Sequence, residues 1–216
     1  MAIVMGPSGV IMSDSTLQTD ARVDTGSLIS ITTFTSSGTY TAPSNCNGVF
    51  VRVQGGGGGA ASYCESGGAG GYSEGFFSIA PGTAVSVTVG GGGGGVGYYA
   101  AGGGGGTSSF GSYLSASGGN GANTVYSHTG GHGGYGAGPV SLAGGGGSGH
   151  ANHHGSGGVA KGGASYFGGP FGSRHSGGEQ IGPGAPGSGA AGGVTDGGAG
   201  GGHSGAAGVV IVYSYT

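Results

Sequence analysis

Charge is the scarcest property of this 216-residue sequence. Only 5% of its residues are charged, Lys and Arg together number four, and the formal net charge is −3. Nucleic acid is therefore not an expected partner, because its phosphate backbone is bound by many Lys and Arg side chains. Disorder is also disfavoured, since disordered chains combine high charge with low hydrophobicity, and 34% of these residues are hydrophobic.

Cysteines and catalytic motifs are equally sparse. Cys46 and Cys64 are too few for a disulfide framework, and they fit either two free thiols or a single bridge. The sequence holds no Walker lysine motif, no HExxH and no CxxC, and its GxGxxG matches carry no weight at this glycine content. No stretch is long and apolar enough to cross a membrane. We therefore expect no enzymatic activity, no cofactor and no membrane insertion.

Glycine dominates what is present, with 66 residues. Ordering so many glycines has a high entropic cost, and large side chains are too few to build an apolar core throughout the chain. Glycine can instead pack as polyproline II helices, whose three-residue turn directs N–H and C=O groups sideways to neighbouring helices. Collagen is excluded because it requires strict Gly-X-Y repeats and abundant proline. The composition predicts a bundle of short antiparallel polyglycine II helices, with no α-helical core.

Two strands bracket most of the glycine. Gly48–Gln54 alternates valines with Phe50 and Arg52, and Val209–Tyr215 is the other long run of β-branched and aromatic residues near a terminus. We expect these two strands to pair as neighbours in one sheet. Residues 76–79 and 84–89 flank Pro81-Gly82, a turn signal, and are expected to form a hairpin. The fold class is thus mainly β, with a small antiparallel β cap on the glycine bundle.

Nine glycine-rich segments are candidates for the helices of the bundle. The three-residue phase is clearest in Gly130–Gly138, where Gly130, Gly133 and Gly136 share one face and Gly131 and Gly134 share another. The nine segments are residues 55–59, 67–71, 90–95, 102–106, 130–138, 143–149, 155–163, 182–193 and 197–208.

Short segments between these runs carry most aromatic and basic side chains of the second half, and they are typical of loops. Loops at one end of the bundle would present flat rings and hydrogen-bonding groups that suit sugars or protein loops. The candidate receptor-binding residues are Tyr98, Tyr99, Tyr126, His128, His150, Asn152, His153, His154, Tyr166, Phe167, Phe171, Arg174 and His175.

The histidine cluster HANHH, with His150, His153 and His154, is the sharpest constellation. A metal site would need three or four ligands in a defined array, with a carboxylate or a further histidine nearby. We favour the simpler interpretation, in which these histidines are small aromatic hydrogen-bonding groups on a solvent-exposed loop. No metal site is therefore predicted.

The first 33 residues differ in composition and are too few to bury a core alone, so they are expected to associate with copies of themselves or with another protein. Their stretch GVIMSDSTLQTDA, residues 9–21, resembles a short repeat of trimeric bacteriophage tail fibres, with Ser15 where glycine is usual. Residues 34–216 resemble the glycine-rich domain at the tips of such fibres. The likeness rests on FTSSGTYTAP, VFVRVQGGGGG, GGAGGYSEGFFSIAPGTAVSVTVGGGGG and the closing GVVIVYSY, taken in order.

This resemblance implies a function. It implies a two-part chain, in which residues 1–33 form a trimerisation arm that docks onto other phage tail or fibre proteins, and residues 34–216 form a β-capped polyglycine II domain with receptor-binding loops. The expected role is attachment of a virion tail fibre, assembled in the host cytoplasm, to a bacterial glycan or outer-membrane protein. The alternatives are a structural fibre component without its own receptor, or a non-viral glycine-rich structural or ice-binding protein.

Overall fold

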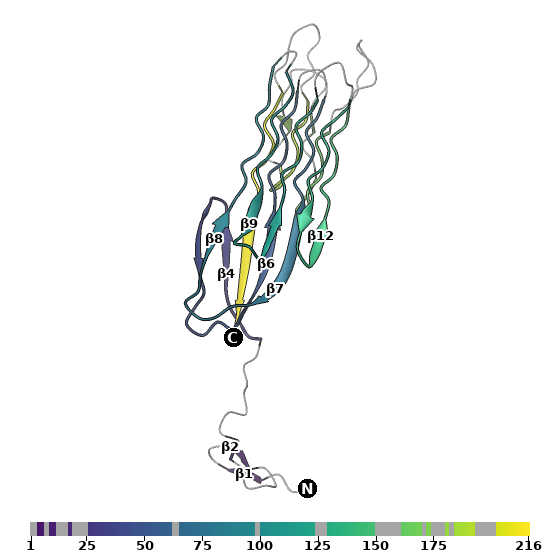
Figure 1. Ribbon diagram of the computed structural model, residues 1–216. Helices are drawn as coiled ribbons and strands as arrows, with labels where there is room; N and C mark the ends of the chain where they lie inside the picture. Colours follow the sequence, from purple (N-terminus) through teal and green to yellow (C-terminus); the bar gives the residue numbers. More distant parts are fainter. Residues whose placement is uncertain are drawn as a thin grey trace.

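The structure is a computed structural model that describes residues 4–6, 9–11, 17–18, 26–61, 65–97, 100–123, 129–149, 161–169, 172–173, 180–181, 184–192 and 202–216. Two five-stranded antiparallel sheets form a sandwich, and glycine-rich segments extend from it side by side toward one end of the molecule (Figure 1). The described residues contain no α-helix. The expectation of a mainly β chain without an α-helical core is confirmed, although the β part is larger than a small cap.

The first sheet contains the two bracketing strands. Their predicted pairing is confirmed, because residues 209–215 pair antiparallel with residues 48–54, from Val209 opposite Gln54 to Tyr215 opposite Gly48. The strand order in this sheet is β12 (Val140–Leu142), β7 (Tyr72–Ser78), β6 (Gly48–Gln54), β15 (Val209–Tyr215) and β4 (Leu28–Phe34).

The second sheet lies against the first and completes the core. Its strand order is β11 (Gly136–Ala137), β10 (Leu114–Ala116), β9 (Ser108–Phe110), β8 (Ala84–Thr88) and β5 (Gly38–Thr41). Alternation places one face of each sheet inward. The buried side chains that meet there include Val49, Val51, Val53, Val210 and Val212 from the first sheet and Val85, Val87, Phe110 and Leu114 from the second. The hydroxyls of Tyr40 and Ser214, on opposite sheets, lie 2.8 Å apart.

The hairpin predicted around Pro81-Gly82 is wrong. A turn is present, and Gly82 has the positive φ of 74° that such a turn requires. The strands on either side of it enter different sheets, however, because β7 pairs with β6 and β12 whereas β8 pairs with β5 and β9. The crossing places Val85 and Val87 opposite the valines of β6 rather than beside them, so that both sets share one core.

Residues 1–33 contribute to two sheets. Strands β1 (Val4–Gly6), β2 (Gly9–Ile11) and β3 (Leu17–Gln18) form a short three-stranded sheet of their own. The expected boundary between residues 33 and 34 falls inside β4. The two residues that precede β4 are held at the C-terminus by hydrogen bonds between Gly26 N–H and Thr216 O and between Thr216 N–H and Ser27 O. Strands β13 (Gly172–Ser173) and β14 (Gln180–Ile181) form a further two-stranded pair.

The glycine-rich segments are joined by backbone hydrogen bonds that run between segments. Residues 55–57 donate, in turn, to segments 65–71, 100–107 and 202–208, and residues 58–60 donate to the same three segments in the same order. The direction of donation therefore repeats every three residues. No side chain takes part in these bonds, so the backbone itself is the packing material.

Two segments form the centre of the described bundle. Segment 55–61 also accepts hydrogen bonds from three further segments, which gives it six neighbours, and segment 65–71 likewise has six. Every described residue of both segments is buried. The surrounding ring consists of segments 89–97, 100–107, 117–123, 129–135, 143–149, 161–164, 187–192 and 202–208, each hydrogen-bonded to the next.

The central glycines have no room for a side chain. A Cβ atom at Gly57, Gly58 or Gly59 would overlap a backbone carbonyl group of a neighbouring segment. The predicted phase is confirmed for four of its five glycines, because a Cβ at Gly130 or Gly133 would meet segment 143–149, and one at Gly131 or Gly134 would meet segment 117–123. Gly136 was wrongly placed on the first of these faces: it lies in strand β11, and a Cβ there would meet Tyr72 O.

Segment 117–123 was absent from the nine sequence candidates, and it contacts both central segments. Gly119 N–H donates to Gly56 O, and Asn120 O accepts from Gly68 N–H. Its sequence SGGNGAN has no long glycine run because a ring segment needs glycine only where it faces its neighbours, while Asn120 and Asn123 are exposed. Residues 155–160, 182–183, 193 and 197–201 of the other candidates lie outside the described residues.

Candidate functional site

The glycine-rich segments end together at the end of the bundle away from the sheets (Figure 1). Hydrogen bonds tie these ends to one another: Val96 N–H donates to Ala60 O, Gly202 N–H donates to Val96 O, and Asn123 Nδ2 donates to Thr129 Oγ1 over 2.7 Å. We call this the free end. The backbone at the free end is held in position, because each segment is fixed to its neighbours up to its last described residues.

Most of the candidate receptor-binding residues belong to stretches that interrupt the described segments. Residues 98–99 and 124–128 fall between described segments that both reach the free end. Their roles stay predictions. The candidates that lie outside the described residues are Tyr98, Tyr99, Tyr126, His128, His150, Asn152, His153, His154, Phe171, Arg174 and His175.

Tyr166 and Phe167, the two described candidates, lie at the opposite end of the glycine segments. They sit in a turn between Ser165 and Gly168, which are joined as an isolated bridge. The Tyr166 ring stacks on Tyr72, the first residue of β7, with ring centroids 3.7 Å apart and an interplanar angle of 12°, and Phe167 meets Tyr72 edge-on at 5.9 Å. The structure thus separates these two aromatic residues from the free end.

A small polar network lies beside this aromatic stack. Tyr72 Oη donates to Glu74 Oε2 over 2.5 Å, and Arg52 Nε lies 3.3 Å from the same oxygen. Burial and the neighbouring Glu74 carboxylate raise the pKa of Tyr72 well above its usual value. The phenol therefore stays protonated and acts as a hydrogen-bond donor, so the network stabilises the junction between sheet and bundle.

Gln54, the last residue of β6, joins the sheet to the central segments. Its side chain is fully buried, and Nε2 donates to the carbonyl oxygens of Gly70 and Gly71 over 2.8 and 3.0 Å. A side-chain amide can satisfy carbonyl groups at the point where the sheet hydrogen bonds give way to those of the bundle.

The outer face of the first sheet carries a surface that the sequence interpretation did not identify. Ile31, Tyr213, Phe50 and Phe76 lie opposite one another across β4, β15, β6 and β7. Ile31 is 55% exposed and Phe76 58% exposed. The alternation of β6 and β15 was a usable signal, since it places Phe50, Tyr213 and other large side chains on the face opposite the core valines.

Among the described residues, no group of three or more His, Cys, Asp or Glu side chains could hold a metal ion, and the HANHH cluster lies outside these residues. Cys46 is a buried free thiol, and Cys64 lies outside the described residues. No helix in the described part of the chain could span a membrane.

Fold and site together define a class: an antiparallel β-sandwich that carries a backbone-bonded bundle of glycine-rich segments on one end. A family model described as a glycine-rich domain matches residues 32–215. The chain therefore belongs to this family of glycine-rich domains. No curated protein matches the sequence.

Proposed function

We propose that this protein is a non-enzymatic attachment protein, a tail-fibre or tail-tip component of a bacteriophage that binds a receptor on the bacterial surface. The single observation that carries the proposal is that the free end of the bundle and the sandwich lie at opposite ends of the domain. All the glycine-rich segments flanking residues 98–99 and 124–128 reach the free end, whereas Leu28 and the C-terminus belong to the sandwich. Binding residues are commonly carried on connecting segments that a rigid scaffold holds in position.

We further propose that the glycine-rich segments are polyglycine II helices. Support comes from the three-residue repeat of hydrogen-bond direction, from the six neighbours of each central segment and from the lack of space for a Cβ at the central glycines. Such a bundle would hold the free end at a fixed distance from the sandwich. In this proposal residues 1–25 join copies of the chain as a homotrimer and dock onto other tail proteins.

The test is binding of the purified, fluorescently labelled chain to a panel of candidate host cells. We expect saturable binding to a susceptible host. Replacement of Tyr98, Tyr99 and Tyr126 by serine should weaken it at least tenfold without changing the far-UV circular dichroism. A matched control replaces Tyr166 and Phe167 by serine at the sheet end, and it should bind as the wild type does.

Two results would contradict the proposal in different ways. A well-folded chain that binds no cell in a broad panel would favour the structural fibre component without its own receptor. Wild-type binding by the Tyr98, Tyr99 and Tyr126 variant, with loss of binding by the Tyr166 and Phe167 variant, would move the receptor site to the sheet end.

A further inference from the structure

We propose that copies of this chain associate through the outer face of the first sheet, beside the edge strand β4. This surface, called the apolar face below, deepens the proposed function because it assigns the contact between subunits to residues outside the N-terminal arm. Its members are Leu28, Ile31, Phe50, Phe76, Ile211, Tyr213 and Tyr215.

The apolar face is continuous and exposed. The ring centroids of Phe50 and Tyr213 lie 6.0 Å apart, and those of Phe76 and Tyr215 lie 6.1 Å apart. The Phe76 ring lies directly over Gly48, where a Cβ would be only 2.5 Å from it. Leu28 is 51% exposed. Contiguous apolar surface of this kind is uncommon on a monomer and marks interaction sites.

The second sheet of the same sandwich provides an internal comparison. Its outer face presents small, mostly hydroxyl-bearing side chains: Thr39 lies opposite Ser86, and Thr88 opposite Ser109. Thr39, Ser86 and Thr88 are exposed. The two outer faces have the same strand architecture, so strand propensity alone does not explain the aromatic and aliphatic residues of the first. A partner that covers only the outer face of the first sheet explains them.

The charges on the apolar face indicate a second copy as that partner. The strands of the first sheet contain only two charged residues, Arg52 and Glu74, which pair with each other. The Arg52 guanidinium also lies over the rings of Phe50 and Tyr213, at 5.5 and 5.6 Å. The face thus offers no unmatched charge for a charged partner. Interfaces between identical subunits are more apolar than others, with charged residues depleted.

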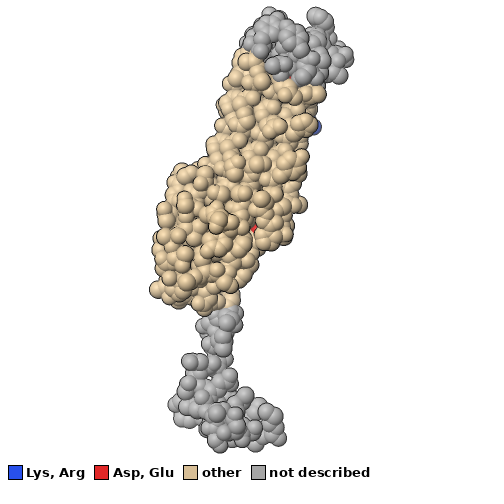
Figure 2. Space-filling view, in the orientation of Figure 1, with Lys and Arg blue, Asp and Glu red and all other residues tan. Residues whose placement is uncertain are grey.

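The edge of the first sheet also favours a second copy of this chain as the partner. Among the described strands, β4 is hydrogen-bonded only to β15, on one side. Its sequence LISITTF has neither charge nor proline to discourage pairing along the other side. Figure 2 shows how little charge the visible described surface carries. Residues 1–25 lead directly into β4, so association here would also bring the N-terminal arms of the copies together. Three apolar faces that meet around a three-fold axis would form the closed homotrimer of the proposed function.

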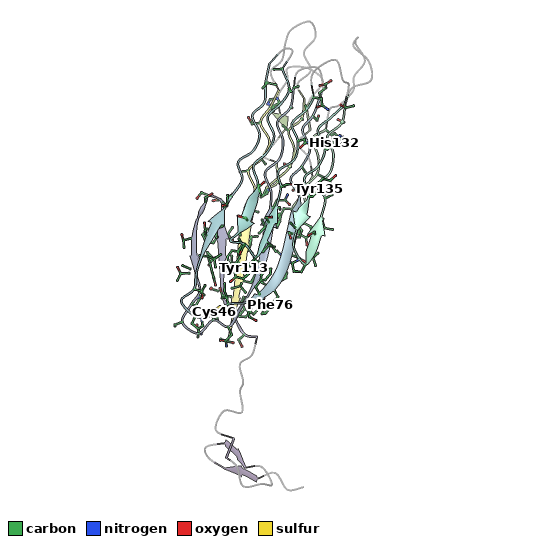
Figure 3. All side chains as sticks on the ribbon, in the orientation of Figure 1. Cys46, Phe76, Tyr113, His132 and Tyr135 are labelled. Carbon is green, nitrogen blue, oxygen red and sulfur yellow. The ribbon has the colours of Figure 1, made fainter. Side chains whose placement is uncertain are left out.

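Light scattering of the purified full chain at several concentrations tests the inference. We expect about three times the 19.8 kDa mass of one chain, as the proposed homotrimer requires. Ile31→Lys should weaken association at least tenfold, so that the 19.8 kDa monomer appears at higher chain concentrations, because the lysine is tolerated at an exposed edge position but would be buried in the contact. Phe76→Ser should act in the same direction. The matched control is Tyr135→Ser, which removes a 70% exposed aromatic side chain from the bundle (Figure 3) and should leave the mass unchanged.

Three outcomes would overturn the inference. One is a wild-type chain that is monomeric at all concentrations, and another is a mass that neither Ile31→Lys nor Phe76→Ser changes at any concentration. The third is a monomer that captures a different protein through the same face. Cell binding of the same samples separates this inference from the proposed function: a monomer that binds host cells overturns the subunit contact alone, whereas an oligomer that binds none contradicts attachment alone.

Discussion

The sandwich and the glycine bundle are both tightly packed, but by opposite means. In the sandwich, side chains such as Val51, Val212 and Phe110 fill the space between two sheets. In the bundle, backbone groups fill the space and the absence of side chains allows the close approach. The two regions are therefore sensitive to opposite kinds of substitution: the bundle is destabilised by added side-chain atoms, and the sandwich by the loss of side-chain atoms.

The largest effect is expected from an added side chain at the centre of the bundle. Gly58→Val would place a branched side chain against the carbonyl oxygen of Asn120, which is backbone and cannot rotate away. Overpacking typically costs about 1–3 kcal/mol and occasionally more. We expect this change to exceed the about 3–5 kcal/mol of a lost core side chain, because no side-chain rotation can relieve a clash with the backbone. Thermal unfolding followed by circular dichroism measures it.

A glycine at the bundle surface provides the control for that experiment. Gly94 is exposed, and a Cβ there would have no atom within 4 Å. Gly94→Ala should be neutral, or stabilising by about 0.4–1 kcal/mol because it restricts the unfolded chain. Equal destabilisation by the Gly58 and Gly94 substitutions would contradict the backbone-packed bundle.

The sandwich should respond to the loss of a large side chain. Phe110 is fully buried between the sheets and contacts Tyr40, with ring centroids 5.6 Å apart. Phe110→Ala should lower the free energy of unfolding by about 3–5 kcal/mol, since it leaves a cavity. Denaturant titration measures the change, and Phe110→Leu, which keeps most of the volume, should recover a large part of it. A near-neutral Phe110→Ala would argue against a side-chain core.

An intermediate effect is expected at the junction of the two regions. Gln54→Leu keeps the side-chain volume close to the original but removes the donor to Gly70 O and Gly71 O. A buried carbonyl that loses its partner costs about 1–3 kcal/mol. Gln54→Glu is the informative second variant, because it keeps the shape and replaces the amide donor with an acceptor. If both variants unfold at the wild-type denaturant concentration, the junction does not depend on these hydrogen bonds.

The smallest effect is a dependence on alkaline pH that originates in the sandwich. Burial raises the pKa of Tyr40, and burial together with Glu74 raises the pKa of Tyr72. The unfolded tyrosines ionise near pH 10, so above that pH the unfolded state binds fewer protons than the folded state and stability falls. Below pH 10 this contribution is fully present.

Urea titrations at pH 8, 10 and 11 would measure the fall, which should not exceed about 1.4 kcal/mol per pH unit for each tyrosine. The Tyr72→Phe variant should show a shallower decline than the wild type. A pH response that is the same in both proteins would place the titrating group elsewhere.

Several features of the fold could be predicted because they depend on local patterns. The alternation in residues 48–54 and 209–215 is enough to identify strands β6 and β15 as partners, since each has one apolar face to bury. The spacing of Gly130, Gly131, Gly133 and Gly134 is enough to assign their faces, because a three-residue turn returns each to a defined neighbour. These successes involve one strand or one segment at a time.

The failures involve the choice between distant partners. A Pro-Gly turn is compatible with a hairpin and with a crossing between sheets, and the choice at residues 81–82 depends on the shared core. Segment 117–123 was missed because its place in the ring requires few glycines, which only its neighbours reveal. Tyr166 and Phe167 could not be placed, since the stack on Tyr72 joins residues more than 90 positions apart in sequence.

By itself, the sequence determined the local elements and the composition: strands that bury valines, glycine segments that leave no room for side chains, and almost no charge. The tertiary structure alone decided that two glycine segments lie at the centre, that the candidate aromatic residues 166–167 sit at the sheet end, and that one outer face of the sandwich is apolar and exposed. The physical reason is that propensity and periodicity act over a few residues, whereas backbone hydrogen bonds between segments and the covering of a sheet face depend on contacts across the whole chain.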